Sequence, residues 1–203
     1  VRDNTFQHGE LGFGLSFPRQ WLIRNQPDRV AATSPQGDAL MEMRLVEKPR
    51  GSPLDFARQY FRLGFSSEIL STTINGLPAA IVTSTQGGKP FRAGVIYHHN
   101  RAFVLAGGGV SSAASASASF NRYQAEITAA ITSFHALTEA ERKAIKPLLV
   151  KTLVVKKGVP SVRYAELAQK SPLGKNAEGY LRLLNGQYPG GEPSPGQTLK
   201  VVE

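Results

Sequence analysis

The sequence of 203 residues contains no cysteine, which excludes disulfides, thiol catalysis and cysteine-ligated zinc within this chain. It also contains no apolar run that approaches the roughly 18 residues of a membrane helix. Neither HExxH nor GxSxG occurs, so the chain encodes neither a zinc-binding peptidase helix nor a serine-nucleophile elbow. Methionine is missing from the first position. We therefore expect Val1 to mark either a cut or a processed end, and a processed end would follow from removal of a targeting segment.

What is present is an ordinary globular composition with an excess of positive charge. Hydrophobic residues make up 41% of the chain, enough to bury a core. The formal net charge is +9, and more than half of it lies in residues 136–203. Such a domain can approach anionic polymers or membrane surfaces, although a basic surface that only contacts solvent is the simpler interpretation.

The densest run of positive charge lies where two parts of the chain are expected to join. It consists of Arg142, Lys143, Lys146, Lys151, Lys156 and Lys157. No aromatic residues are interleaved with these side chains to stack on bases, so nucleic acid is the weakest candidate partner. Lipid headgroups and cell-wall polymers remain open, beside a solvated linker face.

The stretch LGFGLSFPRQW predicts a strand followed by a core anchor. Apolar residues alternate with glycine and serine over 11–17, which gives the strand one apolar face. Pro18 ends the strand because it has no N–H for a ladder. Trp21 is the only tryptophan, and a side chain of this size usually anchors a core. We expect the first two thirds of the chain to form a sheet around this strand.

Further elements follow from alternation, caps and turns. Strands are expected at 4–7, 22–25, 30–33, 39–46, 69–74, 77–83, 91–97 and 102–106. Asn75-Gly76 predicts a type I′ hairpin. Ser52-Pro53 begins a helix that Gly64 ends, and apolar spacing predicts a second helix over 120–134. The fold class is therefore α+β, with a mostly antiparallel sheet covered by two helices.

Between the last strand and the second helix lies the low-complexity stretch GGGVSSAASASAS, residues 107–119. It predicts a flexible loop or the frayed start of the helix. Because Gly109 to Ser112 precede a helix start, a small-anion site is an alternative, although the GKS/T ending of a P-loop is missing.

The last quarter predicts strand, helix, helix and strand, at 152–155, 164–168, 180–184 and 195–202. Thr138 and Glu141 predict a capping box for a short helix over 140–145, which Pro147 ends. We therefore expect an α+β sandwich at 1–135, a basic helical linker at 136–147 and a small βααβ domain at 148–203.

Two local motifs resemble known domains. GFxLxFPxxW at 12–21 resembles the opening hairpin of PsbP/Mog-type domains, which are αβα sandwiches that mostly bind partners. LNG at 184–186 and PGQxLKV at 195–201, in a βααβ order, resemble LysM. The resemblance places glycan contacts in the two loops that flank the helices. These residues are Gly158, Val159, Pro160 and Ser161, with Gly186, Gln187, Tyr188 and Pro189. The first loop departs from LysM, which usually has Gly-Asp-Thr where this chain has Gly-Val-Pro.

Taken together, the ordered motifs resemble the C-terminal region of bacterial HExxH zinc metalloproteases related to the CAAX prenyl protease. The resemblance implies a non-catalytic accessory region in the periplasm or cell envelope. It implies no cofactor in this chain, with zinc only in a separate protease domain. The partner would be that protease domain or another protein. Two alternatives stay open: a peptidoglycan-binding module, and a stand-alone PsbP/Mog-like scaffold.

Titratable residues give no pattern of a catalytic or metal site. None of the histidines belongs to HExxH, and the adjacent pair is expected to point to opposite faces of a strand. The histidines are His8, His98, His99 and His135. Four acidic residues lie near one another in the sequence and are interpreted as surface charge rather than as an acid–base pair. They are Asp28, Asp38, Glu42 and Glu47.

Overall fold

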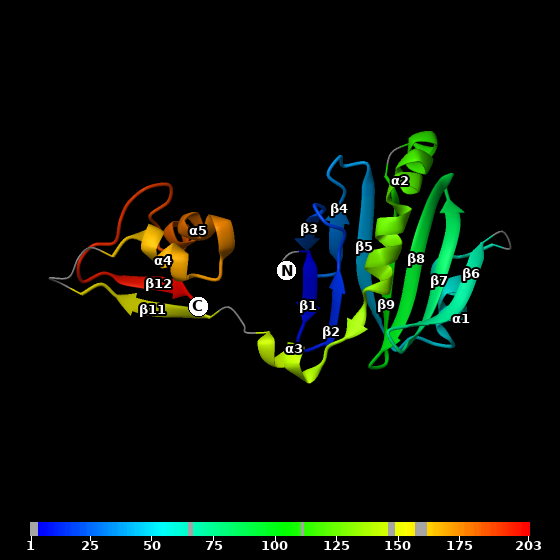
Figure 1. The fold of residues 1–203 in the computed structure, drawn as a ribbon, viewed down its shortest axis with the longest axis horizontal. Coiled ribbons are helices and arrows are strands. Elements are labelled where there is room, and N and C mark those ends of the chain that lie inside the picture. The colour runs from blue at the N-terminus through cyan, green and yellow to red at the C-terminus, as the bar shows by residue number, and fades with distance from the viewer. Residues whose placement is uncertain (1–3, 65–66, 111, 146–148, 157–161) are drawn as a thin grey trace. The chain divides into compact units, whose positions relative to one another are not determined.

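The computed structural model consists of two compact units, residues 1–145 and 146–203 (Figure 1). It describes residues 4–64, 67–110, 112–145, 149–156 and 162–203. Among these described residues, no helix is long and apolar enough to cross a membrane.

The first unit is built on a seven-stranded sheet in which every neighbouring pair is antiparallel. The order across the sheet is β3-β4-β5-β9-β8-β7-β6. The strands are β3 (Leu22–Asn25), β4 (Val30–Thr33), β5 (Ala39–Glu47), β6 (Glu68–Ile74), β7 (Leu77–Gln86), β8 (Lys89–His98) and β9 (Arg101–Gly109). The predicted antiparallel sheet is confirmed.

The opening strand does not lie in this large sheet, contrary to the sequence-based expectation. It is β2 (Phe13–Ser16), the middle strand of a separate sheet with β1 (Thr5–His8) and β10 (His135–Ala136). Alternation identifies the buried face of a strand but not the sheet that the strand joins. The apolar face still enters the core: the ring centroid of Phe13 lies 4.6 Å from that of Phe103 and 5.2 Å from that of Phe134.

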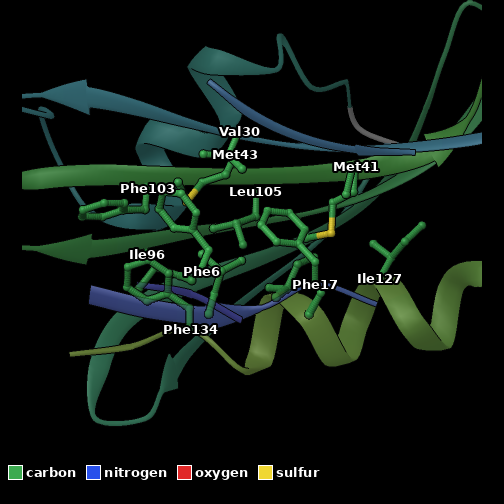
Figure 2. Close-up of a cluster of buried hydrophobic side chains, with 14 of the residues drawn as sticks. Phe6, Phe17, Val30, Met41, Met43, Ile96, Phe103, Leu105, Ile127 and Phe134 are labelled. Atoms are coloured by element: carbon green, nitrogen blue, oxygen red, sulfur yellow. The ribbon is translucent and has the colours of Figure 1, made fainter. Parts of the chain in front are cut away.

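Helices cover both faces of the large sheet (Figure 1). The helix α2 (Ala113–Thr132) and the small sheet lie on one face, and α1 (Pro53–Tyr60) lies on the other. Successive strand residues point to opposite faces, so Phe103 joins the core under α2 and Val104 the core under α1. Figure 2 shows the first of these cores. Trp21 is 4% exposed within it, as expected of an anchor.

The glycines at 107–109 are strand residues, so the prediction of a flexible loop is wrong there. Gly107 and Gly109 lie in the last part of β9, on the face of the sheet that α2 covers. A Cβ on Gly107 would lie 2.9 Å from the Cγ2 of Ile127, and one on Gly109 would overlap the backbone of Ala116. The missing side chains let the helix approach the sheet closely. Residues 113–119 form the first turns of α2. Ser111, which belongs to the proposed anion loop, lies outside the described residues.

The predicted Asn75-Gly76 hairpin is confirmed, and it also holds the end of α2. Both residues have positive φ, 49° and 81°, as a type I′ turn requires. The Nδ2 of Asn75 donates to the carbonyls of Thr132 and Phe134, at 3.0 and 2.8 Å. The turn therefore satisfies carbonyls that the end of a helix leaves without a partner.

The predicted capping box at Thr138 and Glu141 is present, and the predicted serine cap at Ser52 is also a capping box. Ser52 and Asp55 cap α1, and Thr138 and Glu141 cap α3 (Glu139–Ala144), which belongs to the first unit. The Glu141 carboxylate also contacts the ring of His135, with Oε1 3.2 Å from Nε2. This contact joins α3 to β10.

The second unit has the predicted order of strand, helix, helix and strand. Its elements are β11 (Val150–Val154), α4 (Tyr164–Lys170), a 3₁₀ turn η1 (Gly174–Asn176), α5 (Ala177–Leu184) and β12 (Thr198–Val202). The two strands pair antiparallel. A small core lies between the helices and the strands, made of Val155, Tyr164, Leu181, Leu199 and Val202.

Both motifs that resemble LysM serve to hold this unit together. The side chain of Asn185 donates to the carbonyls of Leu181 and Lys200 at 2.8 and 2.9 Å, and accepts from the Lys200 N–H at 2.7 Å. It therefore ties the end of α5 to β12. Gly186, at φ +69°, and Gln187 complete a Schellman motif, donating to the carbonyls of Leu183 and Arg182.

Candidate binding groove on helix α5

Of the two loops expected to contact a glycan, the structure describes only the second. Gly158, Val159, Pro160 and Ser161 lie outside the described residues. In the second loop, Gly186 shapes the turn after α5, and the Gln187 side chain is already engaged. Its Oε1 accepts from the hydroxyl of Tyr164, and its Nε2 donates to the carbonyl of Glu192 at 3.2 Å. These two residues therefore stabilise the loop.

Tyr188 and Pro189, by contrast, line an open groove of about 560 Å³ along α5. We call it the α5 groove. Its lining residues are Lys175, Asn176, Glu178, Gly179, Tyr180, Arg182, Leu183, Tyr188 and Pro189. Three of its large apolar side chains are well exposed: Tyr180 by 54%, and Leu183 and Tyr188 by 64% each. A group of exposed apolar side chains of this kind commonly marks a binding surface.

The helical period explains why these side chains face outward. Ala177 and Leu181 are buried, one turn apart, and define the core side of α5. Tyr180 and Leu183 lie outside that side and are exposed to solvent. Sequence reasoning placed the helix but missed its outer face, and the signal available was two large apolar residues outside the apolar stripe.

Arg182 lines the α5 groove and is held by an ionic network. Its Nη2 lies 2.7 Å from Glu178 and 2.6 Å from Glu192, and its Nη1 donates to the Gly191 carbonyl. The guanidinium also lies 5.1 Å from the ring centroid of Tyr164. Only 12% of this side chain is exposed. The charge is thus shared with two carboxylates, and Arg182 positions the wall of the groove.

The ionisation of the network follows from these contacts. Hydrogen bonds to Glu178 and Glu192 raise the pKa of Arg182. Burial works against ionisation of Glu192. The Tyr164 N–H and Arg182 outweigh it and hold the pKa of this carboxyl below its ordinary value. Arg182 and Glu192 therefore stay ionised near neutral pH.

The chemistry of the α5 groove is that of recognition. Two phenol rings and a leucine supply apolar surface, Asn176 an amide and Lys175 a cation. The described lining residues include no nucleophile paired with a general base. The arrangement suits an elongated ligand that has apolar faces and many hydroxyl or amide groups.

The residues of the expected basic run fall in both units. Arg142 and Lys143 lie in α3 of the first unit, and Lys151 and Lys156 lie in the second. Lys146 and Lys157 are outside the described residues. Lys151 is paired with Glu203, with Nζ 2.6 Å from Oε2. A continuous basic surface stays a prediction.

His98 and His99 do not point apart, contrary to the expectation from strand alternation. Their ring centroids lie 3.9 Å apart. The reason is that β8 ends at His98, while His99 and Asn100 form the turn with positive φ, 47° and 57°. His98 Nε2 lies 3.1 Å from the Gly12 carbonyl oxygen. Across the described residues, no group of three histidine or acidic side chains could hold a metal ion.

The four acidic residues near one another in the sequence take part in local pairs. Glu42 contacts Arg29 and Arg44 at 3.4 and 3.3 Å. Asp28 lies 3.5 Å from Arg44, and Glu47 lies 3.6 Å from Arg101. Asp38 accepts hydrogen bonds from Ser34 and Ser119, at 2.8 and 2.7 Å, which join the β4–β5 turn to α2.

Comparison with known proteins finds similar solved structures. No protein-family model matches the sequence, and no curated protein does. Among similar solved structures is the cyanobacterial PsbP (CyanoP) from Synechocystis sp. PCC 6803, at 10% identity and a TM-score of 0.43. The match covers 65% of this chain and 91% of that one. A protein from Bacteroides thetaiotaomicron VPI-5482 matches at 13% identity and a TM-score of 0.42, over 84% of this chain and 58% of that one.

Proposed function

We propose that this chain is a non-catalytic binding protein whose second unit holds a cell-envelope glycan in the α5 groove. The observation that carries the proposal is the pair of exposed tyrosines, Tyr180 and Tyr188, that line one groove together with polar side chains. Peptidoglycan is the proposed glycan, which agrees with the LysM-like order of the unit. The first unit then serves as a scaffold in the periplasm or cell envelope.

The physical basis is the match between a sugar ring and a phenol. A pyranose has an apolar C–H face and a rim of hydroxyls, and a tyrosine has an apolar ring face and one hydroxyl. The N-acetyl groups of peptidoglycan add amides that Asn176 can pair with. Because Arg182 is held by Glu178 and Glu192, the groove offers little net charge to attract an anionic polymer. Binding should therefore depend on the two rings and only weakly on salt.

The test is sedimentation of the whole chain with purified peptidoglycan sacculi at low and high salt. We expect Tyr180→Ala and Tyr188→Ala each to weaken binding about tenfold, which corresponds to loss of about 1.4 kcal/mol. Tyr60→Ala is the matched control, because Tyr60 is an exposed tyrosine of α1 in the first unit. Equal binding by all three variants would contradict the proposal, as would binding that high salt abolishes.

We also propose a wider setting, in which the chain is the accessory region of a zinc metalloprotease. The supporting observation is that the residues behind this resemblance are packing and capping residues. Trp21 packs in the core, Thr138 caps α3, and Asn185 joins α5 to β12. Proteins that share this fold would need such residues for packing and capping even where the domain has no active site. The coding region upstream of Val1 should then encode HExxH. An immediate start codon would contradict this setting, as would peptidase activity of this chain that a chelator abolishes.

A further inference from the structure

The inner face of the large sheet, by which we mean the face that α2 and the small sheet cover, is partly uncovered at one end of the first unit. Met41, Met43 and Leu45 alternate along β5 and share the face that α2 and the small sheet cover. Met41 is fully buried and Met43 is 6% exposed, but Leu45 is 36% exposed. The covering layer therefore ends between Met43 and Leu45. An apolar side chain of the inner face reaches solvent there.

A cavity of about 330 Å³ lies at this end, between the β1–β2 hairpin, the β3–β4 turn and β5. Its inner wall is aromatic: Phe6, Phe13 and Phe103 line it, and each is at most 7% exposed. Val30 and Met43 line it too, and Figure 2 shows both close to Phe103. Binding sites for small molecules usually have this volume and a mostly apolar lining with a few polar groups. We call this cavity the hairpin pocket.

The two charged residues of opposite sign at the rim, Asp28 and Arg29, are already paired with residues of β5. Arg29 lies 3.4 Å from Glu42 and donates to Gln26 at 2.6 Å. Asp28 lies 3.5 Å from Arg44. A charged ligand would have to compete with these pairs, and it would lose its own hydration at an aromatic wall. The rim therefore favours an uncharged ligand.

His8 supplies a polar group beside the aromatic wall. Its ring stacks on Phe13 with centroids 6.0 Å apart, and its Nδ1 accepts from the Leu11 N–H at 3.3 Å. In the neutral ring, the proton is then on Nε2, which can donate one hydrogen bond. A single carbonyl or hydroxyl oxygen on the ligand would satisfy it.

We propose that the hairpin pocket binds a small uncharged apolar molecule, with an aromatic ring or a short acyl chain as its body. This site lies in the first unit and does not depend on the glycan groove of the second. A free small molecule fits the observations better than a side chain of a protein partner. The pocket reaches the aromatic core, and the rim residues Asp28 and Arg29 are paired with Arg44 and Glu42 instead of presenting their charges to a partner's surface.

The probe is N-phenyl-1-naphthylamine, a neutral aromatic compound whose fluorescence rises in apolar surroundings, titrated into the whole chain. We expect saturable binding by the wild type. Leu45→Trp should narrow the mouth and Leu45→Asp should place a charge there, so each should weaken binding about tenfold or more. Leu70→Trp is the matched control, because Leu70 is an exposed leucine on β6 at the other edge of the sheet. It should bind within about twofold of wild type.

Two comparisons can overturn the proposal. The anion 8-anilino-1-naphthalenesulfonate has the same two ring systems with a sulfonate added, and it should bind about tenfold more weakly. Binding as tight as that of the neutral probe would remove the claim that the ligand is uncharged. Absence of saturable binding by the wild type would overturn the site, as would equal loss in the Leu70→Trp control. Near-ultraviolet circular dichroism checks that each variant keeps its packed core.

Discussion

At the scale of single residues, the glycines of β8 and β9 decide how closely α2 packs. Side chains at Gly94 and Gly107 would meet side-chain carbons of Ile131 and Ile127, which could give way only by repacking within the core. A side chain at Gly109 would instead meet the backbone of Ala116, with a Cβ 2.6 Å from its Cα. Backbone cannot rotate away, so Gly109 is the position where a methyl group should cost most.

We therefore expect Gly109→Ala to lower the free energy of unfolding of the first unit by about 3 kcal/mol, because overpacking must displace α2 from the sheet. Urea unfolding followed by Trp21 fluorescence measures it. The matched control is Gly64→Ala, since nothing lies within 4 Å of a Cβ at Gly64. If both variants unfolded at the same urea concentration, the close approach of α2 would not depend on Gly109.

His98 should make the first unit less stable in mild acid. Burial, with His99 and Arg142 nearby, lowers its pKa below the ordinary value of 6.5. The unfolded chain then binds the proton more readily than the folded chain, so stability falls as the pH drops below about 6.5. His98→Gln removes this proton site, and its stability should fall less between pH 7 and 5. Equal slopes for both proteins in urea unfolding would contradict this.

Asp38 acts in a separate, lower range of pH. The hydrogen bond from Ser119 holds the pKa of Asp38 below its ordinary value of 3.8. Its contribution to stability is present above that value and is lost as the pH falls through the lower folded-state pKa. The range from pH 7 to 5 therefore lies above the titration of Asp38, and the comparison with His98→Gln isolates the contribution of His98.

At the scale of elements, the side chain of Asn185 is the main polar link between α5 and β12. We expect Asn185→Ala to lower the free energy of unfolding of the second unit by about 2 kcal/mol, since the Lys200 N–H and two carbonyls lose partners. Asn176→Ala is the control, because Asn176 makes no capping hydrogen bond at the start of α5. Thermal unfolding by far-ultraviolet circular dichroism compares them. A control variant as unstable as Asn185→Ala would refute the link.

Elements with strong local signals were predictable from sequence. The Asn75-Gly76 hairpin, the helix start at Ser52 and the capping box at Thr138 depend on neighbours in the chain, and all three are confirmed. The sheet that β2 joins depends on β10, more than a hundred residues away, and local alternation carries no such information. The strand character of Gly107 to Gly109 was missed for the same reason, because the helix that requires those glycines packs on them only in the folded state.

The candidate sites were likewise predictable only where their residues are neighbours in the sequence. The resemblance to LysM predicted four contact residues in the second loop. Tyr188 and Pro189 do line the α5 groove, whereas Gly186 and Gln187 hold the turn after α5. Tyr180 belongs to the groove through the outer face of α5, which the helical period would have indicated. The hairpin pocket left no sequence pattern, because its walls come from separate strands and a turn.

At the scale of the whole molecule, each unit has its own core. Trp21 lies in the first unit and reports on that core alone. We expect Asn185→Ala to leave the urea midpoint of Trp21 fluorescence unchanged while it lowers stability of the second unit. Gly109→Ala should do the reverse. If either variant shifted both units equally, the chain would unfold as one cooperative body.

The central claim is that the second unit holds a glycan along α5. The most direct measurement is a titration of the ¹⁵N-labelled whole chain with a tetramer of β-1,4-linked N-acetylglucosamine, followed by amide chemical shifts. The account predicts saturable shifts concentrated at 175–183 and 188–189, and their loss in Tyr188→Ala. Absence of shifts at millimolar sugar, or shifts centred on other residues, would contradict it.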